Sequence, residues 1–177
     1  MKILAIYFML CGTLYAADST NTSTPVSVPP KADPIALGET NGFGVQFFLV
    51  EGEKFFSDWE KPEPPHIAPI SVGRRGVPIC TAVIFVGAGL KPDGSADVTY
   101  DTVVRKPDGS VYANDKDLVG AQGKIDPAPK ALQLARDFTG IRIEPKDPAG
   151  VYTVEVVVKD NVKKVELRLI RKFTVEL

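Results

Sequence analysis

The chain has 177 residues, with 21 basic and 22 acidic side chains and a formal net charge of −1. So balanced a charge excludes strong electrostatic steering toward nucleic acid or an anionic membrane surface. The length suffices for one compact domain that buries about two thirds of its chain surface. Composition therefore indicates a globular protein but names no partner.

The first 16 residues have the pattern of a secretory signal peptide. Lys2 precedes an apolar run from Ile3 to Leu10, and small residues follow at positions 16 and 17. The run is too short to cross about 30 Å of hydrocarbon, so we expect cleavage after Ala16 rather than a retained membrane anchor. Cys11 could mark a lipoprotein, but the large residue before it argues against lipidation. The expected location is the periplasm or the extracellular medium.

A flexible leader, residues 17–40, is expected to precede one folded domain, residues 41–177. The segment from Asp18 to Ile35 is rich in Ser, Thr and Pro and has no apolar period. Such a composition buries too little surface to offset the entropy of ordering. The leader is either a spacer or a terminus without a role. The glycosylation pattern at Asn21 is a short motif and weak evidence.

Two apolar stretches predict strands in the first half of the domain. Residues 43–50, FGVQFFLV, are apolar on nearly both sides of a strand, and residues 77–86, VPICTAVIFV, form a run typical of a central strand covered on both faces. Cys80 lies in this run beside Ala82 and Ile84, so we interpret it as a small core residue. After signal cleavage it is the only cysteine, and no intramolecular disulfide is expected.

The segment from Phe55 to Pro69 mixes three aromatic residues with several prolines and predicts a surface loop. Phe55, Phe56 and Trp59 are candidates for an exposed aromatic binding patch, and His66 is a fourth candidate in the same segment. The favoured alternative is that these rings hold the loop on the open end of the core.

A local repeat marks two turns. Lys91-Pro92-Asp93-Gly94-Ser95 recurs as residues 106–110, and Pro, Asp and Gly suit successive positions of a tight turn. Residues 97–105 form the strand between the turns, and a returning strand begins at Val111. Asp93, Asp97, Asp101 and Asp108 do not suit a calcium site, because alternate strand positions diverge while calcium needs six to eight converging oxygens. Residues 120–130 are expected to be a loop, and residues 131–135 a short strand or one helical turn.

Residues 138–177 predict three consecutive antiparallel strands. Apolar residues alternate from Tyr152 to Val158 and again from Val165 to Leu169, with a turn between them. We expect these residues to face residues 77–105 across one core. The same period would place Arg171 inward, which predicts a bulge or strand end near residues 170–172.

Motifs for catalysis, cofactors and metals fail in context. Gly87-Ala88-Gly89 follows a strand, but no helix begins there to bind a phosphate. A Ser-His-Asp triad would have to use His66, but the sequence has no nucleophile elbow and no sign of a partner that would orient this histidine. Zinc sites draw on several His and Cys ligands, and the mature chain offers only His66 and Cys80. We therefore expect no catalytic, cofactor-binding or metal-binding residues, although a carboxylate pair stays open.

The run Asp147-Pro148-Ala149-Gly150-Val151-Tyr152 resembles the corner between strands E and F of immunoglobulin-like and fibronectin type III sandwiches. The resemblance implies that Tyr152 bonds back onto nearby backbone, and Gly150 frees the chain to turn into the next strand. Val154 stands where antibody domains have a cysteine, and Trp59 precedes the central strand, so the antibody pattern itself is absent. The implied fold is a single immunoglobulin-like antiparallel β-sandwich, and the whole chain resembles small exported bacterial proteins.

The expected function is binding rather than catalysis. The first hypothesis is an accessory module that docks on another envelope or secreted protein, because no catalytic constellation is apparent. The alternative is a carbohydrate- or cell-wall-binding domain in which exposed rings stack on sugars. An enzyme of unrecognised type would need an acid pair in a cleft. Neither a nucleic acid partner nor a membrane span after signal cleavage is expected.

Overall fold

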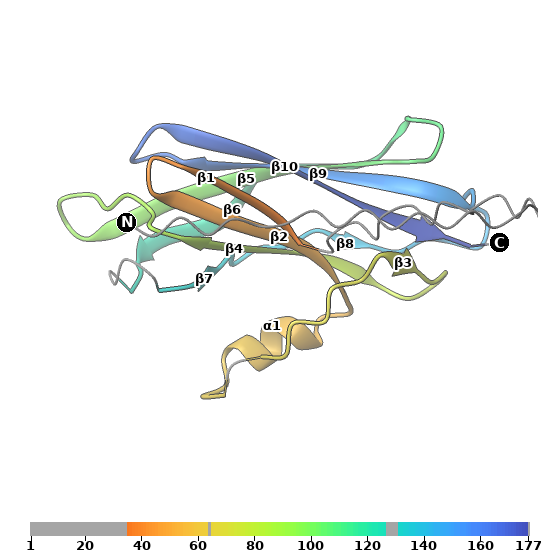
Figure 1. Cartoon of the computed structure of the whole chain (residues 1–177), viewed down its shortest axis with the longest axis horizontal. Helices are drawn as coiled ribbons and strands as arrows, with labels where there is room; N and C mark the ends of the chain where they lie inside the picture. Colours follow the sequence, from red (N-terminus) through yellow and green to blue (C-terminus); the bar gives the residue numbers. More distant parts are fainter. Residues whose placement is uncertain (1–34, 64, 127–130, 177) are drawn as a thin grey trace, which may run out of the picture. The chain divides into compact units, whose positions relative to one another are not determined.

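The computed structural model describes residues 35–63, 65–126 and 131–176. They form two β-sheets and one short helix (Figure 1). The expected all-β sandwich is confirmed. The expected signal peptide and the leader up to residue 34 lie outside the described residues. In the described part, no helix is long and apolar enough to cross a membrane.

The first sheet has the strand order β1-β2-β4-β7, and β8 also pairs with β4. All of these pairs are antiparallel, and β7 and β8 meet opposite ends of β4. The bounds are Ala36–Thr40 for β1, Phe43–Glu51 for β2, Ile79–Val86 for β4, Gln133–Leu134 for β7 and Gly140–Ile141 for β8.

The β1–β2 hairpin turns at Asn41 and Gly42, whose φ angles are 49° and 67°. A left-handed backbone at both central residues is the geometry of a two-residue hairpin turn, which favours Asn-Gly. Because β1 spans residues 36–40, assigning all of residues 17–40 to a flexible leader is wrong for its last five residues. The folded part of the chain begins before Asn41.

The second sheet has the strand order β3-β10-β9-β5-β6. Only the short β3 runs parallel to its neighbour, β10, and the other pairs are antiparallel. The bounds are Val72–Gly73 for β3, Ser95–Arg105 for β5, Val111–Lys124 for β6, Gly150–Asp160 for β9 and Val165–Val175 for β10.

Several expectations about strand partners are wrong. β8 belongs to the first sheet, so residues 138–177 are not three neighbouring strands. β5 pairs with β9 in one sheet instead of facing it across the core. β6 continues to Lys124, where a loop from residue 120 was expected. Local sequence pattern specifies a strand but not the sheet that receives it.

The predicted interruption of the last strand is also wrong. β10 keeps one continuous register with β9, and Arg171 lies opposite Val154 without a bulge. The Arg171 side chain shares the inward face with Leu169 and Phe173 but is half-buried rather than enclosed. A long arginine stem can cover apolar surface while its charged end reaches water.

The main core lies between the two sheets. Strands β5 and β9 alternate strictly between buried inward and partly exposed outward side chains, as a period of two requires. Aromatic rings fill the largest volumes, and Tyr152 stacks on Phe173 with 5.2 Å between ring centroids. Fully buried contributors are Phe43, Phe47, Leu49, Ile79, Val83, Phe85, Val98, Tyr100, Val104, Ile141, Ile143, Val154, Val156 and Val158.

The repeated Lys-Pro-Asp-Gly-Ser segments form the two predicted turns. Oδ1 of Asp93 accepts hydrogen bonds from the Ser95 amide at 2.9 Å and the Ser95 hydroxyl at 2.6 Å. Oδ1 of Asp108 accepts the corresponding hydrogen bonds from the Ser110 amide at 2.9 Å and the Ser110 hydroxyl at 2.7 Å. In each turn one carboxylate oxygen accepts two hydrogen bonds from the serine two residues later, which indicates a structural role for both segments.

Thr102 on β5 gives a stability prediction. Its hydroxyl is buried in the core and has no hydrogen-bond partner among the described residues. An unpaired buried hydroxyl is destabilising, so Thr102→Val should raise the free energy of unfolding by about 1 kcal/mol in guanidinium denaturation. The matched control is Thr81→Val, which should lower it because the Thr81 hydroxyl accepts the Thr139 amide at 2.9 Å. Equal effects of the two substitutions would contradict this assignment.

Candidate docking face on the first sheet

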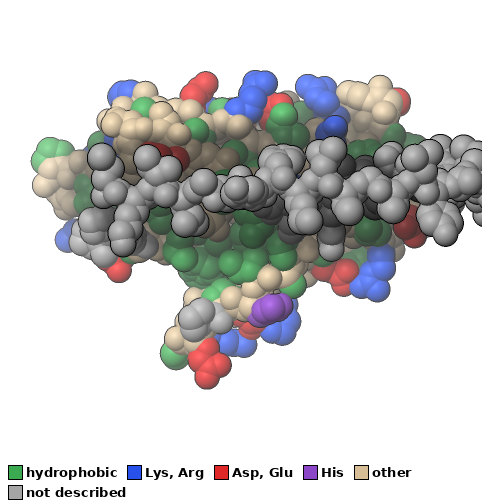
Figure 2. All heavy atoms as spheres, viewed as in Figure 1, with side chains coloured by type: hydrophobic (Ala, Val, Ile, Leu, Met, Phe, Trp, Pro, Cys, Tyr) green, Lys and Arg blue, Asp and Glu red, His purple; other side chains and the backbone are tan. Residues whose placement is uncertain are grey.

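The outer face of the first sheet is apolar over its central strands. Phe48 and Val50 on β2 and Cys80, Ala82 and Ile84 on β4 are all buried and form a second hydrophobic cluster, separate from the main core. Strands β2 and β4 are therefore buried on both faces, as their near-continuous apolar runs predict. Figure 2 shows hydrophobic side chains gathered over these strands, next to the helical segment.

The helix α1, Lys54–Trp59, covers one half of this face and lies on the side away from the second sheet (Figure 1). The Phe55 ring is 7% exposed and packs edge-on against Phe48 at 5.5 Å. Phe56 stacks on Phe138 at 4.2 Å, and Trp59 packs on Phe55 at 5.9 Å. Residues expected in a loop thus form a helix, and its rings cover the outer face rather than the open end of the core.

A hollow of about 330 Å³ lies beside α1, and the exposed His66 is among its lining residues. Its two carboxylates are paired with cations: Glu51 with Arg74 at 2.5 Å, and Asp58 with Lys54 and Lys61. Hydrogen bonds from Lys54 and then Lys61 hold the pKa of Asp58 below its ordinary value. A general acid needs a raised pKa, so Asp58 is poorly suited to that role. The lining residues are Val50, Glu51, Lys54, Phe55, Asp58, His66, Ala68 and Ile70.

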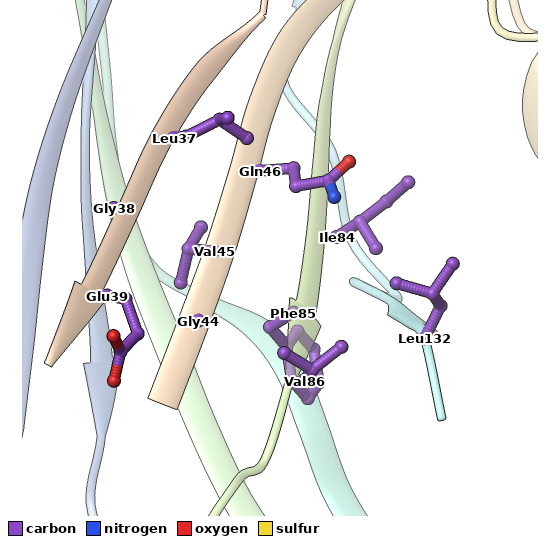
Figure 3. Close-up of a pocket in the computed structure, with 10 residues that line it drawn as sticks. All are labelled: Leu37, Gly38, Glu39, Gly44, Val45, Gln46, Ile84, Phe85, Val86 and Leu132. Atoms are coloured by element: carbon purple, nitrogen blue, oxygen red, sulfur yellow. The ribbon is translucent and has the colours of Figure 1, made fainter. Parts of the chain in front are cut away.

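An open groove of about 370 Å³ occupies the other half of the face (Figure 3). Leu37 on β1 and Leu132 before β7 stand on its two flanks and are 65% and 51% exposed. Between them, Gln46 pairs with Leu37 on one side and with Ile84 on the other. The lining residues are Leu37, Gly38, Glu39, Gly44, Val45, Gln46, Ile84, Phe85, Val86 and Leu132.

Gly44 leaves space at the floor of the groove because it has no side chain. A Cβ at this position would lie 3.0 Å from Cγ2 of Val86, which faces the same groove. Ile84 belongs both to the groove lining and to the buried cluster beneath α1, so the open and covered halves form one continuous apolar face. None of the groove residues had been predicted from the sequence as part of a binding site, and Leu37 fell in the expected leader.

Cys80 lies beneath the α1 region and is 1% exposed. Burial, and after it the negative charge of Glu53, raise the pKa of the Cys80 thiol to about 11. A protonated, enclosed thiol is unreactive. Among the described residues, no three His, Cys, Asp or Glu side chains gather as a potential metal site.

Tyr152 and Gly150 lie at a corner remote from the groove. The Tyr152 hydroxyl donates a hydrogen bond to the carbonyl of Pro148 at 2.8 Å, the backbone contact that the family resemblance implied. Gly150 has φ 130°, and a Cβ there would lie 2.9 Å from Cγ of Pro107. These geometries assign both residues to the folding of the corner.

Comparisons with known proteins add little to this geometry. No family model and no curated protein matches the chain. Among solved structures, it is similar to a family 123 glycoside hydrolase from Clostridium perfringens, described in a study of glycolipid glycan hydrolysis. The TM-score is 0.42 with 9% identity, and the match covers 76% of this chain but 27% of that chain. This chain thus spans just over a quarter of that enzyme's length, and the likeness is too low to indicate an activity.

Proposed function

We propose that the protein is an exported, non-catalytic accessory module that docks on another envelope or secreted protein through the groove between Leu37 and Leu132. The observation that carries the proposal is the exposure of these two large apolar side chains on the flanks of one hollow. Apolar concavities with a few polar groups are typical of recognition sites. Glu39 and Gln46 are the polar groups here.

The occupant that fits the groove is a short extended segment of the partner that carries one or two large apolar side chains. The hollow of about 370 Å³ is of the size that binding pockets have. Val86 provides apolar contact on the floor, and the Gln46 amide can pair with a backbone group of the segment. Leu37 and Leu132 would close over the two sides of the inserted side chain.

We also infer that the domain belongs to the immunoglobulin-like sandwiches. In chain order, β5, β6, β9 and β10 would be strands C, C′, F and G, and their spatial order β10-β9-β5-β6 agrees with that assignment. The bond from Tyr152 to Pro148 lies at the start of the strand that would be F. Domains of this architecture serve many functions, so the docking proposal depends on the groove and not on the fold.

Carbohydrate or cell-wall binding remains the alternative function. Stacking on a sugar requires a free ring face. Phe55 is buried against Phe48, and Phe56 and Trp59 are half-buried and pack on Phe138 and Phe55. The packing of these rings favours protein docking over sugar stacking.

Site-specific crosslinking followed by affinity measurement tests the proposed function. A photoreactive phenylalanine analogue replacing Leu132 in the producing cells should capture a partner that the same analogue at Val151, exposed on the second sheet, does not capture. With the purified partner, Leu37→Asp should weaken binding by about tenfold or more, because a charge would enter an apolar contact.

The matched control is Ile170→Asp, which places the same charge at an exposed apolar site on the outer face of the second sheet. Its affinity should equal that of the unmodified protein. An unchanged affinity for Leu37→Asp, or capture of the same proteins from both analogue positions, would contradict docking through the groove.

A further inference from the structure

Among the described residues, the segment that carries α1, residues 53–61, is attached to the sandwich by apolar side-chain contacts. Its hydrogen bonds within the described structure stay inside the segment, as from the Phe56 amide to the Glu53 carbonyl at 3.1 Å. The chain is anchored on both sides of the segment by backbone hydrogen bonds. The Gly52 amide donates to the Pro78 carbonyl, and the Ile70 amide donates to the Leu49 carbonyl at 2.9 Å. Between these anchors, apolar packing holds the segment in place.

The helix itself has little intrinsic stability. It has six residues, no side-chain cap at Glu53, no acid in its first turn and no base in its last, whereas isolated helices need about 12 to 15 residues. The ion pairs of Asp58 with Lys54 and Lys61 are internal and exposed, and such pairs contribute little in water. Gly52, with φ 67°, supplies a flexible joint immediately before the segment.

Lifting this segment would uncover sheet surface without opening the main core. Phe48, Val50 and Cys80 belong to the outer cluster, whereas the residues between the sheets form a separate cluster. Because Ile84 is shared by the outer cluster and the open groove, the uncovered surface would extend the groove along β2 and β4.

We propose that residues 53–61 are a lid that opens about Gly52 while both sheets stay folded, and that the lid competes with the docking partner for the outer face of the first sheet. The opening is independent of the proposed function. The competition rests on the proposed function, because it requires a partner that docks in the groove.

Cys80 is a direct reporter of the opening. In the full chain with Cys11→Ser it is the only thiol, and it lies under the lid near Glu53. The experiment measures the rate of Cys80 alkylation by iodoacetamide against guanidinium concentration, beside global unfolding of the same protein. At low denaturant, we expect labelling that is much faster than global unfolding allows and nearly independent of denaturant, the signature of local opening.

Phe56→Ala removes the stack on Phe138 and should speed labelling by about tenfold or more, because an aromatic truncation destabilises only the closed lid. Leu167→Ala, on the second sheet and half-buried, is the matched control. It should lower the denaturation midpoint and leave labelling at low denaturant unchanged. The lid proposal would be overturned if Cys80 labelling tracked global unfolding in all variants, or if Cys80 were not labelled at all.

The partner supplies the second measurement. Phe56→Ala should tighten binding of the captured partner by severalfold, because the competing segment is weakened. Unchanged affinity together with faster labelling would overturn the competition while the opening stands. Failure of the groove variants to affect binding would instead reject the proposed function, so the two failures are distinguishable.

Discussion

Val156→Asp is expected to abolish the folded state. Val156 is 0% exposed at the centre of β9, between Thr102 on β5 and Leu169 on β10, and its side chain enters the main core. A buried charge without a partner costs several kcal/mol against a typical stability of about 5 to 15 kcal/mol. Circular dichroism at neutral pH should show loss of the sheet signal and no cooperative thermal transition.

Val157→Asp is the matched control, one residue along the same strand. Val157 lies on the outer face of the second sheet and is half-buried, so the same charge should reach water and cost about 1 kcal/mol or less. The contrast depends on the two-residue period of a strand, which places neighbours on opposite faces. A cooperative melt of Val156→Asp close to that of Val157→Asp would show that the inward face is wrongly assigned.

Much of the fold could be predicted because several strands carry their own pattern. β9 alternates apolar and polar residues, β4 is a continuous apolar run, and the two Lys-Pro-Asp-Gly-Ser segments specify turns. β1 was missed because its apolar content is small, although Asn41-Gly42 is a strong hairpin signal that was present in the sequence.

Sheet membership could not be predicted from the same patterns. β8 has two residues, and its pairing with β4 is decided by tertiary contact rather than by any local period. Arg171 was expected to break β10 because an inward position was equated with full burial. Its half-buried side chain shows that part of the inward face near this edge of the sheet is open to water.

The candidate site depends on contacts that no single stretch encodes. Leu37, Gln46, Ile84 and Leu132 lie on separate segments and become neighbours only when the first sheet forms. The aromatic residues near Trp59 were visible in the sequence, but their exposure depends on the second apolar face beneath them. The sequence did predict that β2 and β4 are buried on both sides, which implies that another part of the chain packs on their outer side.

Asp160→Ala is expected to cause the second large loss of stability. The Asp160 carboxylate is 1% exposed and accepts the backbone amides of Gly89 at 2.7 Å, Val162 at 3.0 Å and Lys163 at 2.9 Å. Removal leaves three amides without their acceptor, each worth roughly 1 to 3 kcal/mol where water cannot replace it, so we expect a total loss of about 3 to 5 kcal/mol. Guanidinium denaturation should show a lower midpoint with an unchanged slope.

Asp108→Ala separates the effect of burial from the loss of hydrogen bonds. Asp108 also accepts two hydrogen bonds, both from Ser110, but its turn is exposed and water can take over the freed donors. Its removal should cost about 1 kcal/mol or less. Equal losses for the two variants would contradict a special role for Asp160. We expect a much larger loss at Asp160, because its carboxylate joins the β9–β10 turn of the second sheet to the segment after β4 of the first sheet and so links the two sheets at that end.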